Sequence, residues 1–399
     1  MKKNKTHELI KRLLFTILIL LVYIAGRSLL LYQVDPAAYE LEELNSQNIM
    51  ISMISGDRYQ YTIFALGIMP YITATLIIWI IMAVRGAEYR ARSSPQKIER
   101  LSLVLMFTIA AASAVSRAKD LVFRESGLAL EVLQAIAILE MLTGAFIIYQ
   151  MATLNKKHGI GGQTPLILVN ILDNLVSTIQ KFAWEELYEA FGLFLIMAMV
   201  ILIMENVIIR IPVQRVSIHN TYADKNYIAF KFDPIGVMPV MFAVSFFMIP
   251  QLAVRFLLFF YGDNSTLQLI YGKLNMTNST GMAIYLGIIF GLNLLFSFII
   301  LMPGEMAGQL QKSGDSIVNV YAGKKTKRYL RRKLLLLCVL SGSIFCIMMG
   351  ISLGLSVKGE ISSELALFPA TGMILTGILF PIYQEVKAYW KFDSYSFFM

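Results

Sequence analysis

The chain has 399 residues, of which 57% are hydrophobic and only 15% are charged. Soluble domains carry roughly 25% charged residues, so this composition excludes a soluble globular enzyme, a disordered chain and a fibrous repeat. The formal net charge of +9 leaves a nucleic-acid partner open until the positions of the basic residues are considered. A membrane-spanning helix needs about 20 apolar residues, and the apolar windows of this chain predict a polytopic helical membrane protein.

Ten apolar windows, separated by charged or turn-rich segments, predict ten transmembrane helices. They lie near residues 12–31, 64–84, 101–117, 128–150, 160–180, 190–209, 235–256, 281–302, 332–355 and 364–384. The first window is too long for the core of a signal peptide, and no small-residue cleavage site follows it. We therefore expect it to be retained as the first span.

Most of the 35 lysines and arginines lie in alternate segments between these windows and at the two ends of the chain. Basic segments flank spans on the cytoplasmic side, so we expect a cell-membrane protein with both termini in the cytoplasm. Topology alone requires these segments, and we expect no nucleic-acid partner. The spans divide into an N-terminal half, residues 1–182, and a C-terminal half, residues 183–399. Five spans per half give the halves opposite orientations, which places the working site at their interface.

The sequence offers little for bond chemistry. Its three histidines, His7, His158 and His219, fall in separate segments that we expect in the cytoplasm. Cys338 and Cys346 lie within one apolar stretch, where neither a disulfide framework nor a zinc site is expected. No metalloprotease, nucleotide-binding or serine-hydrolase motif occurs. We therefore expect no enzyme activity, no metal site and no cofactor.

Titratable side chains inside the spans would indicate an ion-coupled transporter or a membrane protease. The candidates are few, and they stand alone or near helix ends: Glu140, Asp173 and Glu205. A single carboxylate near a helix end usually reaches the interface or pairs with a neighbouring arginine. We expect structural roles for all three.

The segment 35–63 does not fit an ordinary span or loop. It contains an apolar patch at 49–54, which a Ser55-Gly56-Asp57 turn ends. Six residues are too few to cross a bilayer, so the patch predicts a short re-entrant half-helix, which survives at that depth only inside protein or beside water. An outer surface loop with an amphipathic patch is the alternative.

The second window opens Phe64-Ala-Leu-Gly-Ile-Met-Pro-Tyr-Ile-Thr-Ala-Thr75. Gly67 and Pro70 are unusual in a lipid-facing helix, and Pro70 is expected to free a backbone carbonyl that neighbouring helices or water must satisfy. The alternative is an ordinary kinked helix packed on its neighbours.

The longest expected cytoplasmic loops are 210–234 and 303–333. The first begins Arg210-Ile-Pro-Val-Gln214, and the second begins Pro303-Gly-Glu-Met-Ala-Gly and continues to Gly314. Two long basic loops on one face could dock an acidic or motor-like partner. Solvated charge that only sets the topology is the alternative.

These residues resemble the SecY-type preprotein translocase channel. Phe64–Thr75 is similar to that family's second-span motif, and Arg210–Gln214 to its loop motif between spans six and seven. Gly236–Ala243 resembles its seventh span, and Pro303–Gly314 its loop between spans eight and nine. Ser52–Gly56 looks like its plug. The five motifs occur in the family's order along nearly the whole chain.

The resemblance implies an all-α fold of ten transmembrane helices in two inverted five-helix halves around a central pore, with a plug half-helix at about 35–63. An apolar ring would close the pore at Ile68, Ile72, Thr164, Leu168, Met241 and Ile374. A narrow apolar constriction holds back ions by dewetting, and a flexible methionine adapts to passing side chains. Ile68 and Ile72, four apart, are expected on one face of a helix, as a pore-lining pair requires.

Three further sets of residues follow from the resemblance. The plug would consist of Met50, Ser52, Met53, Ile54, Ser55 and Gly56. A lateral gate toward lipid would include Thr73, Thr75, Trp79 and Ser245. The motor-docking loops would use Arg210, Gln214, Arg215, Lys312, Tyr321, Lys324, Lys325, Lys327 and Arg328.

The chain departs from the family pattern at several of these places. Gly159-Ile-Gly-Gly-Gln-Thr-Pro165 replaces the usual fifth-span sequence, Tyr321 replaces an arginine associated with the motor ATPase, and Trp79 replaces a glutamine of the lateral gate. These departures resemble the accessory Sec paralogue of Gram-positive bacteria, which exports large glycosylated serine-rich adhesins with its own motor.

The function expected first is therefore the protein-conducting channel of an accessory Sec translocase. The implied partners are an accessory SecA-type ATPase, small SecE-like and SecG-like membrane subunits, a preprotein substrate and membrane lipid. The housekeeping SecY channel for general secretion and membrane insertion is the alternative. A small-molecule secondary transporter is a remote alternative. Such transporters are expected to carry carboxylates that couple transport to ions within discontinuous helices, and these are nearly absent here.

Overall fold

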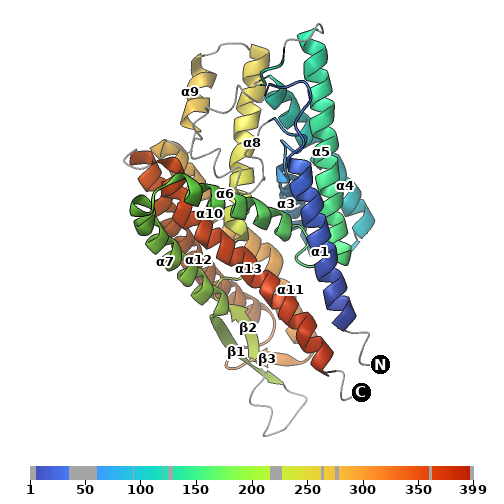
Figure 1. Ribbon diagram of the computed structural model, residues 1–399. Coiled ribbons are helices and arrows are strands. Elements are labelled where there is room, and N and C mark those ends of the chain that lie inside the picture. The colour runs from blue at the N-terminus through green and yellow to red at the C-terminus, as the bar shows by residue number, and fades with distance from the viewer. Residues whose placement is uncertain are drawn as a thin grey trace.

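The computed structural model describes residues 6–35, 61–92, 94–119, 121–124, 129–215, 227–261, 265–274, 278–358 and 362–395. These residues form a bundle of long helices with a small β-sheet at one end (Figure 1). Both ends of the chain lie at the sheet end of the bundle. Neither this sheet nor the two short helices that accompany the long ones were predicted from the sequence.

A long helix occupies each of the ten predicted windows. They are α1 (Thr6–Arg27), α3 (Met69–Arg92), α4 (Pro95–Ala118), α5 (Leu130–His158), α6 (Thr164–Lys181), α7 (Trp184–Asn206), α8 (Met238–Tyr261), α10 (Ser279–Leu301), α12 (Lys324–Lys358) and α13 (Ser363–Tyr395). Eight candidate spans among the described residues are long and apolar enough to cross a membrane, and the apolar part of α3, Met69–Met82, is shorter. The membrane class is confirmed, while the number of ten spans stays a prediction.

The second span begins later than the sequence predicted. Residues 64–68 form a buried turn, and α3 starts only at Met69. Gly67 has φ 52°, a left-handed conformation that glycine adopts freely and that a helix cannot continue through. Pro70 stands in the first turn of α3, where its missing N–H removes no helical hydrogen bond. The alternative of a helix kinked at Pro70 is therefore wrong, because this proline starts the helix.

The sheet is built from the two long loops expected in the cytoplasm. Its strands are β1 (Ile208–Arg215), β2 (Tyr227–Lys231) and β3 (Asp315–Ile317), joined in the antiparallel order β2–β1–β3. The short helix α11 (Pro303–Lys312) precedes β3, and α9 (Ser265–Lys273) lies beside α8. The central strand β1 thus fastens the loop after α7 to the loop after α10.

Alternation of side chains explains why β1 is a strand. Ile211 is buried, and it lies in one apolar cluster with Phe230 of β2 and Ile317 of β3. Arg210 points to the exposed face, as the two-residue period of a strand requires. The apolar face of the sheet covers Ala307 of α11 and Leu330 of α12, which anchors both loops to the helices.

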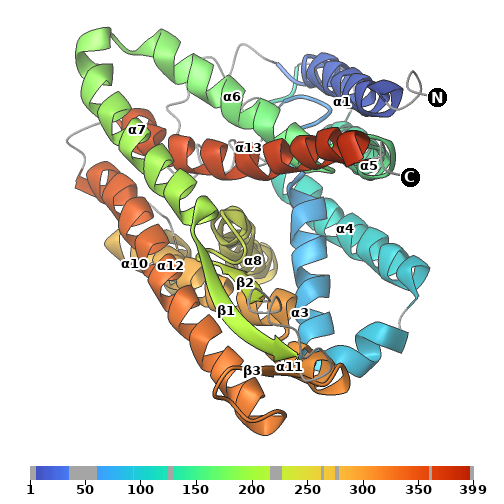
Figure 2. The same ribbon diagram turned by 90° about the horizontal axis from the view of Figure 1, so that it is seen from below.

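The helices surround α8, as the view from the sheet end shows (Figure 2). α7 packs along α13 and α10 packs along α12, while α4 lies between α3 and α5. α8 contacts α10 on one side and both α3 and α4 on the other. The largest apolar cluster draws its members from most of the long helices, so the core lies in the middle of the bundle.

The turn between α5 and α6 is held by a buried polar network. The Thr16 hydroxyl donates to the Asn155 side-chain oxygen at 2.9 Å, and it accepts from the Ile160 backbone N–H at 2.9 Å. The Asn155 amide donates to the carbonyls of Ile160, at 3.1 Å, and Gly162, at 2.6 Å. These bonds satisfy backbone groups that no helix satisfies and tie the turn to α1.

Replacing Asn155 tests this network. Asn155→Ala should lower the free energy of unfolding by about 2–3 kcal/mol, because the Thr16 hydroxyl and the carbonyls of Ile160 and Gly162 lose a partner. Asn206→Ala is the matched control, since the exposed Asn206 donates only to a carbonyl of its own helix. Thermal melting in detergent is the measurement, and equal melting points for the two variants would contradict the prediction.

Candidate functional site

The central apolar cluster gathers most of the side chains predicted to form a pore ring. Ile68, Ile72, Met241 and Ile374 are all buried members of it, and Leu168 of α6 packs against it. These residues are far apart in sequence, so only the fold brings them together. The cluster is where a constriction through the middle of the bundle would lie.

Two members of the predicted ring lie at helix starts. Ile68 directly precedes α3, and its carbonyl accepts from the Ile72 N–H at 3.1 Å, so the two residues stand one helical turn apart and both are buried in the central cluster. Thr164 is half-buried at the first residue of α6, and its N–H donates to the Gly161 carbonyl at 3.0 Å. The membership of Thr164 in a ring stays a prediction.

The predicted plug falls outside the described residues. Its members are Met50, Ser52, Met53, Ile54, Ser55 and Gly56. The expected plug segment, 35–63, is described only at its two ends, where Ile63 donates through its N–H to the carbonyl of Leu29 at 3.0 Å.

α3 and α8 meet along a line that we name the α3–α8 seam, defined by Met69 and Trp79 on α3 and by Phe242 and Ser245 on α8. The Ser245 hydroxyl donates to the Met69 sulfur at 3.3 Å. Of the other two predicted gate residues, Thr73 donates to the Met69 carbonyl and Thr75 to that of Ile72, each at 2.8 Å. Both threonine hydroxyls are therefore satisfied within α3.

Trp79 joins an aromatic cluster at the seam. Its ring centroid lies 5.7 Å from that of Phe242 on α8 and 5.8 Å from that of Phe296 on α10. The two phenylalanine rings lie 5.2 Å apart at an interplanar angle of 60°. Tilted and edge-to-face pairs at these distances are favourable arrangements of aromatic rings. The tryptophan thus contacts two helices from the later part of the chain.

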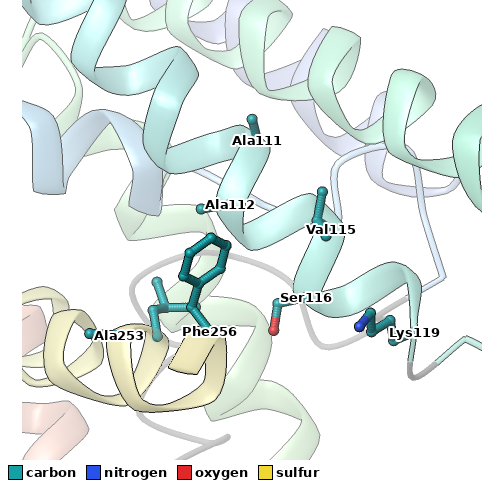
Figure 3. A pocket seen from close by; sticks show the side chains of 8 residues that line it. Ala111, Ala112, Val115, Ser116, Lys119, Ala253 and Phe256 are labelled. Carbon is teal, nitrogen blue, oxygen red and sulfur yellow. The ribbon is translucent and has the colours of Figure 1, made fainter. Parts of the chain in front are cut away.

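A groove of about 460 Å³ continues the seam between α4 and the last turns of α8 (Figure 3). Its lining is Ala111, Ala112, Val115, Ser116, Lys119, Leu252, Ala253 and Phe256. It adjoins a hollow of about 260 Å³ beside Met69, Thr73 and Ser245, and the two share Ala112 and Leu252. The Phe256 ring points toward α4, and Lys119 stands at one end. The seam is therefore filled by rings near the sheet and hollowed at its other end.

The predicted docking residues lie on or beside the sheet. The Arg210 guanidinium lies 4.8 Å from the centroid of the Tyr227 ring, and the Lys325 ammonium 4.4 Å from that of Tyr321. Tyr321 is 76% exposed, and Arg215 lies opposite Asp315 in the β1–β3 register. The remaining predicted residues are also exposed: Gln214, Lys312, Lys324, Lys327 and Arg328. The fold thus collects both loops into one basic and aromatic surface.

A buried charged group lies between this surface and the helices. The Lys231 ammonium lies 3.3 Å from a carboxylate oxygen of Glu205 and donates to the Gln384 side chain at 3.3 Å. The Asp233 carboxylate accepts from the Gly236 N–H at 3.1 Å. Burial, and next the charge of Glu205, raise the pKa of the Asp233 carboxyl to about 7. Gly236 has φ 71°, and an added Cβ would lie 2.5 Å from Glu205 Oε1, so glycine is required there.

The carboxylates singled out from the sequence have partners. Asp173 pairs with Arg27 at 2.8 Å, which confirms the expected pairing with an arginine. Glu140 accepts from Gln33 at 3.3 Å, and Glu205 pairs with a lysine in the group just described. Each contact joins segments far apart in the sequence, so these residues hold the fold together.

The other candidates for chemistry are dispersed. Cys338 is buried and Cys346 is half-buried, and both are free thiols. The His158 ring packs edge-on against Phe15 at 5.6 Å, whereas His219 lies outside the described residues. Within the described residues, no three His, Cys, Asp or Glu side chains are arranged to hold a metal ion.

The helical bundle with a buried apolar centre and a basic sheet at one end defines a polytopic membrane protein, and comparisons identify its kind. The sequence model of the SecY family matches residues 62–380. The "Accessory Sec system protein translocase subunit SecY2" of Streptococcus sanguinis is 26% identical over 398 residues, covering 97% of both chains. The protein of the same name from Streptococcus salivarius is 25% identical over 410 residues, covering 99% of both.

Solved structures share the fold. "The structure of a protein conducting channel" aligns with a TM-score of 0.66 and 17% identity over 96% of this chain and 93% of that one. Sec61 in the canine ribosome-channel complex aligns with a TM-score of 0.63, with the same identity and coverage. Because the family model spans most of its length, the chain belongs to the SecY family.

Three parts of this site were not predicted from the sequence. The buried group around Lys231 and Asp233 was not predicted, although Asp233-Pro-Ile-Gly236 is a turn pattern that marks a helix start. Phe242 and Phe296 were not connected to Trp79, because each lies in an apolar run typical of any span. The alternation Ile-Arg-Ile-Pro-Val-Gln in β1 was the available signal for the sheet.

Asp233 gives a prediction about pH. A carboxyl whose pKa is raised by folding stabilises the folded state at low pH, where it is protonated. This stabilisation is lost as the pH rises from 3.8, the ordinary pKa of the group, through about 7, its pKa in the folded state. Asp233→Asn keeps an acceptor for the Gly236 N–H and removes the ionisation. Between about pH 5 and 7 the free energy of unfolding of the parent should fall by about 1 kcal/mol per pH unit relative to that of Asp233→Asn. Melting curves at several pH values measure this, and parallel pH profiles would refute it.

Proposed function

We propose that the chain is the protein-conducting channel of an accessory Sec translocase, which passes a preprotein across the cell membrane. The observation that carries the proposal is the end-to-end similarity to accessory translocase subunits, and the central apolar cluster, which gathers most of the residues predicted to form the ring, supports it. The departures at Tyr321 and Trp79 favour an accessory rather than a housekeeping channel. The proposed cargo is a large serine-rich glycosylated adhesin.

The physical need for such a channel supports the ring. A translocating chain carries polar peptide groups that cannot cross hydrocarbon unsatisfied, so it needs a wet path among helices. The path must still exclude ions, which a narrow apolar constriction does by dewetting. Ile68, Ile72, Leu168, Met241 and Ile374 would close around the path, and the plug segment would cover it when idle.

The sheet end would face the cytoplasm, with both termini. Its exposed lysines and arginines follow the positive-inside rule, and they gather on one surface only because β1 joins the two loops. An accessory SecA-type ATPase would dock there and supply the energy from ATP. The exposed aromatic ring of Tyr321, with Lys325 stacked on it, would contact this motor in place of the usual arginine.

Within the membrane, the channel would contact lipid at the seam between its two halves, and lipid or small subunits at the outer face of α1. Residues 1–182 and 183–399 would move as two halves and part at the α3–α8 seam toward lipid. The outer face of α1 is apolar and exposed along Leu14, Leu18 and Leu21. Such a face suits lipid or the single-span SecE-like and SecG-like subunits that would hold the halves together.

A cross-linking experiment tests the proposed function. Cys338 and Cys346 are replaced by Ala, and Ile68→Cys places one thiol in the central cluster. A tagged serine-rich preprotein bearing one cysteine is stalled during export by the accessory motor, and the disulfide-linked adduct is measured. Leu21→Cys is the lipid-facing control, because Leu21 is 63% exposed on the outer face of α1.

A strong adduct at position 68 and none at position 21 is the expected result, and it would establish the central path and the cargo class together. An adduct only with an ordinary secretory precursor would replace the accessory channel by the housekeeping channel. No adduct with either cargo would reject a protein-conducting path and favour a small-molecule transporter.

The ring makes a separate prediction about ions. Ile68→Asn combined with Met241→Asn should raise the ion conductance of the channel in planar bilayers severalfold, because polar side chains keep the constriction wet. Ile68→Val with Met241→Leu is the matched control, since it keeps the constriction apolar. The plug segment is deleted in both variants, because a plug that blocks the path would hide a difference in ion conductance at the ring. Equal conductances would then count against the ring.

A further inference from the structure

Two buried carboxylates meet where the sheet joins the helices. Glu205 lies in the last turn of α7 and is 3% exposed, and Asp233 lies between β2 and α8 and is 1% exposed. Both adjoin Gly236. The N–H of this glycine donates to Asp233 Oδ1 at 3.1 Å, and a Cβ added to it would lie 2.5 Å from Glu205 Oε1. Two acidic groups are thus enclosed around one residue just before α8.

Within the described residues, each of these carboxylates has one buried oxygen without a hydrogen-bond partner. The two oxygens are Asp233 Oδ2 and Glu205 Oε1. The other oxygen of Glu205 lies 3.3 Å from Lys231 Nζ, and the other oxygen of Asp233 accepts from Gly236. A buried acceptor without a donor costs free energy, and an ionised carboxylate has no hydrogen to donate to its neighbour.

The charges around Asp233 do not balance when both carboxyls are ionised. The charged or titratable side chains near it are Glu205 of α7, Lys231 of β2 and the Cys338 thiol of α12. On the side of α13, Lys231 meets the uncharged amide of Gln384. Two carboxylates and one ammonium leave one negative charge enclosed, and a carboxyl in that position tends to keep its proton. Burial and the charge of Glu205 accordingly raise the pKa of the Asp233 carboxyl to about 7.

We propose that Asp233 and Glu205 bind one proton between them, and that release of this proton loosens the start of α8 from the end of α7. The protonated Asp233 carboxyl donates from Oδ2 to Glu205 Oε1, which gives both oxygens a partner. The charges of Glu205 and Lys231 then cancel. When the proton leaves to water at the sheet end, two carboxylates share a site that holds one ammonium, and they repel each other.

The start of α8 reaches into the central apolar cluster, so this motion acts on the predicted ring. Val237 and Met241 both belong to the cluster, and the Met241 N–H donates to the Val237 carbonyl at 3.3 Å. Val237 also packs against α13, where a Cβ added to Gly377 would lie 2.5 Å from its own. A shift of Asp233 is therefore passed to Met241. As a means of regulating the channel, this step rests on the proposed function: the bound proton keeps the constriction closed.

Infrared spectroscopy tests the proton without any transport, since a protonated carboxyl has a carbonyl band that an ionised carboxylate lacks. In the purified protein in lipid nanodiscs, such a band should disappear as the pH rises from about 6 to about 8, and Asp233→Asn should show no such change. Glu205→Gln should move the midpoint to lower pH, because the charge that raises the pKa of Asp233 is removed.

Glu8→Gln is the matched control for the infrared measurement. The side chain of Glu8 is 70% exposed on α1, where it pairs with Arg12, so this variant should keep the band and the midpoint of the parent. A change that persists in Asp233→Asn would overturn the proposal. So would the lack of any pH-dependent band in the parent, because water or a metal cation between the two carboxylates gives none.

The effect on the channel is measured as ion conductance in planar bilayers, with the plug segment deleted. Raising the pH at the sheet end from about 6 to about 8 should increase the conductance of the parent severalfold. In Asp233→Asn the side-chain amide donates to Glu205 in place of the proton, so the conductance should keep the low-pH value of the parent throughout. Glu8→Gln should follow the parent.

A parent conductance that does not rise with pH, or an equal rise in Asp233→Asn, would overturn the link between the proton and α8. Neither result would bear on the proposed function, because the cross-linking of a preprotein at position 68 is measured at a single pH. Failure of that cross-linking, with the infrared change present, would refute the channel and leave the proton site standing.

Discussion

Within a bilayer every peptide N–H and C=O must find its partner inside the protein, and the rest of this structure follows from that constraint. Long helices meet it by themselves. The non-helical backbone beside them is sheltered, since residues 64–68 are buried and Asn155 bonds two carbonyls of the turn before α6. The strands among the described residues lie at one end of the bundle (Figure 1). A path for the polar backbone of another chain must therefore run among helices.

Polar contacts are unevenly spread around that path. Ion pairs and hydrogen bonds fix α13 to the early helices, whereas packed rings fill the α3–α8 seam. A directional contact resists sliding and turning, while ring packing can be broken in one place and remade with a different side chain.

Composition and apolar windows were enough to predict the helices, because hydrocarbon leaves few alternatives. The start of α3 was misplaced because Gly67 and Pro70 looked like interruptions within a span, and only the backbone conformation shows that they precede and begin it. The residues predicted to form a ring were singled out only through family motifs, since each looks like ordinary core. Trp79 was singled out, but its partners Phe242 and Phe296 could not be, because contacts between distant spans leave no local pattern.

The shared strand β1 has a consequence for how such channels diversify. It continues directly from α7 and pairs with β2 of its own loop and with β3 of the loop after α10. Inserting one residue inside β1 would turn its apolar face outward along the remaining length of the strand. Related channels can therefore change the length or the charge of the loops on either side of β1, but the strand itself must keep its length. The two loops are then inherited as one unit, and if a motor docks on them as proposed, a change of motor in evolution would have to be met by both together.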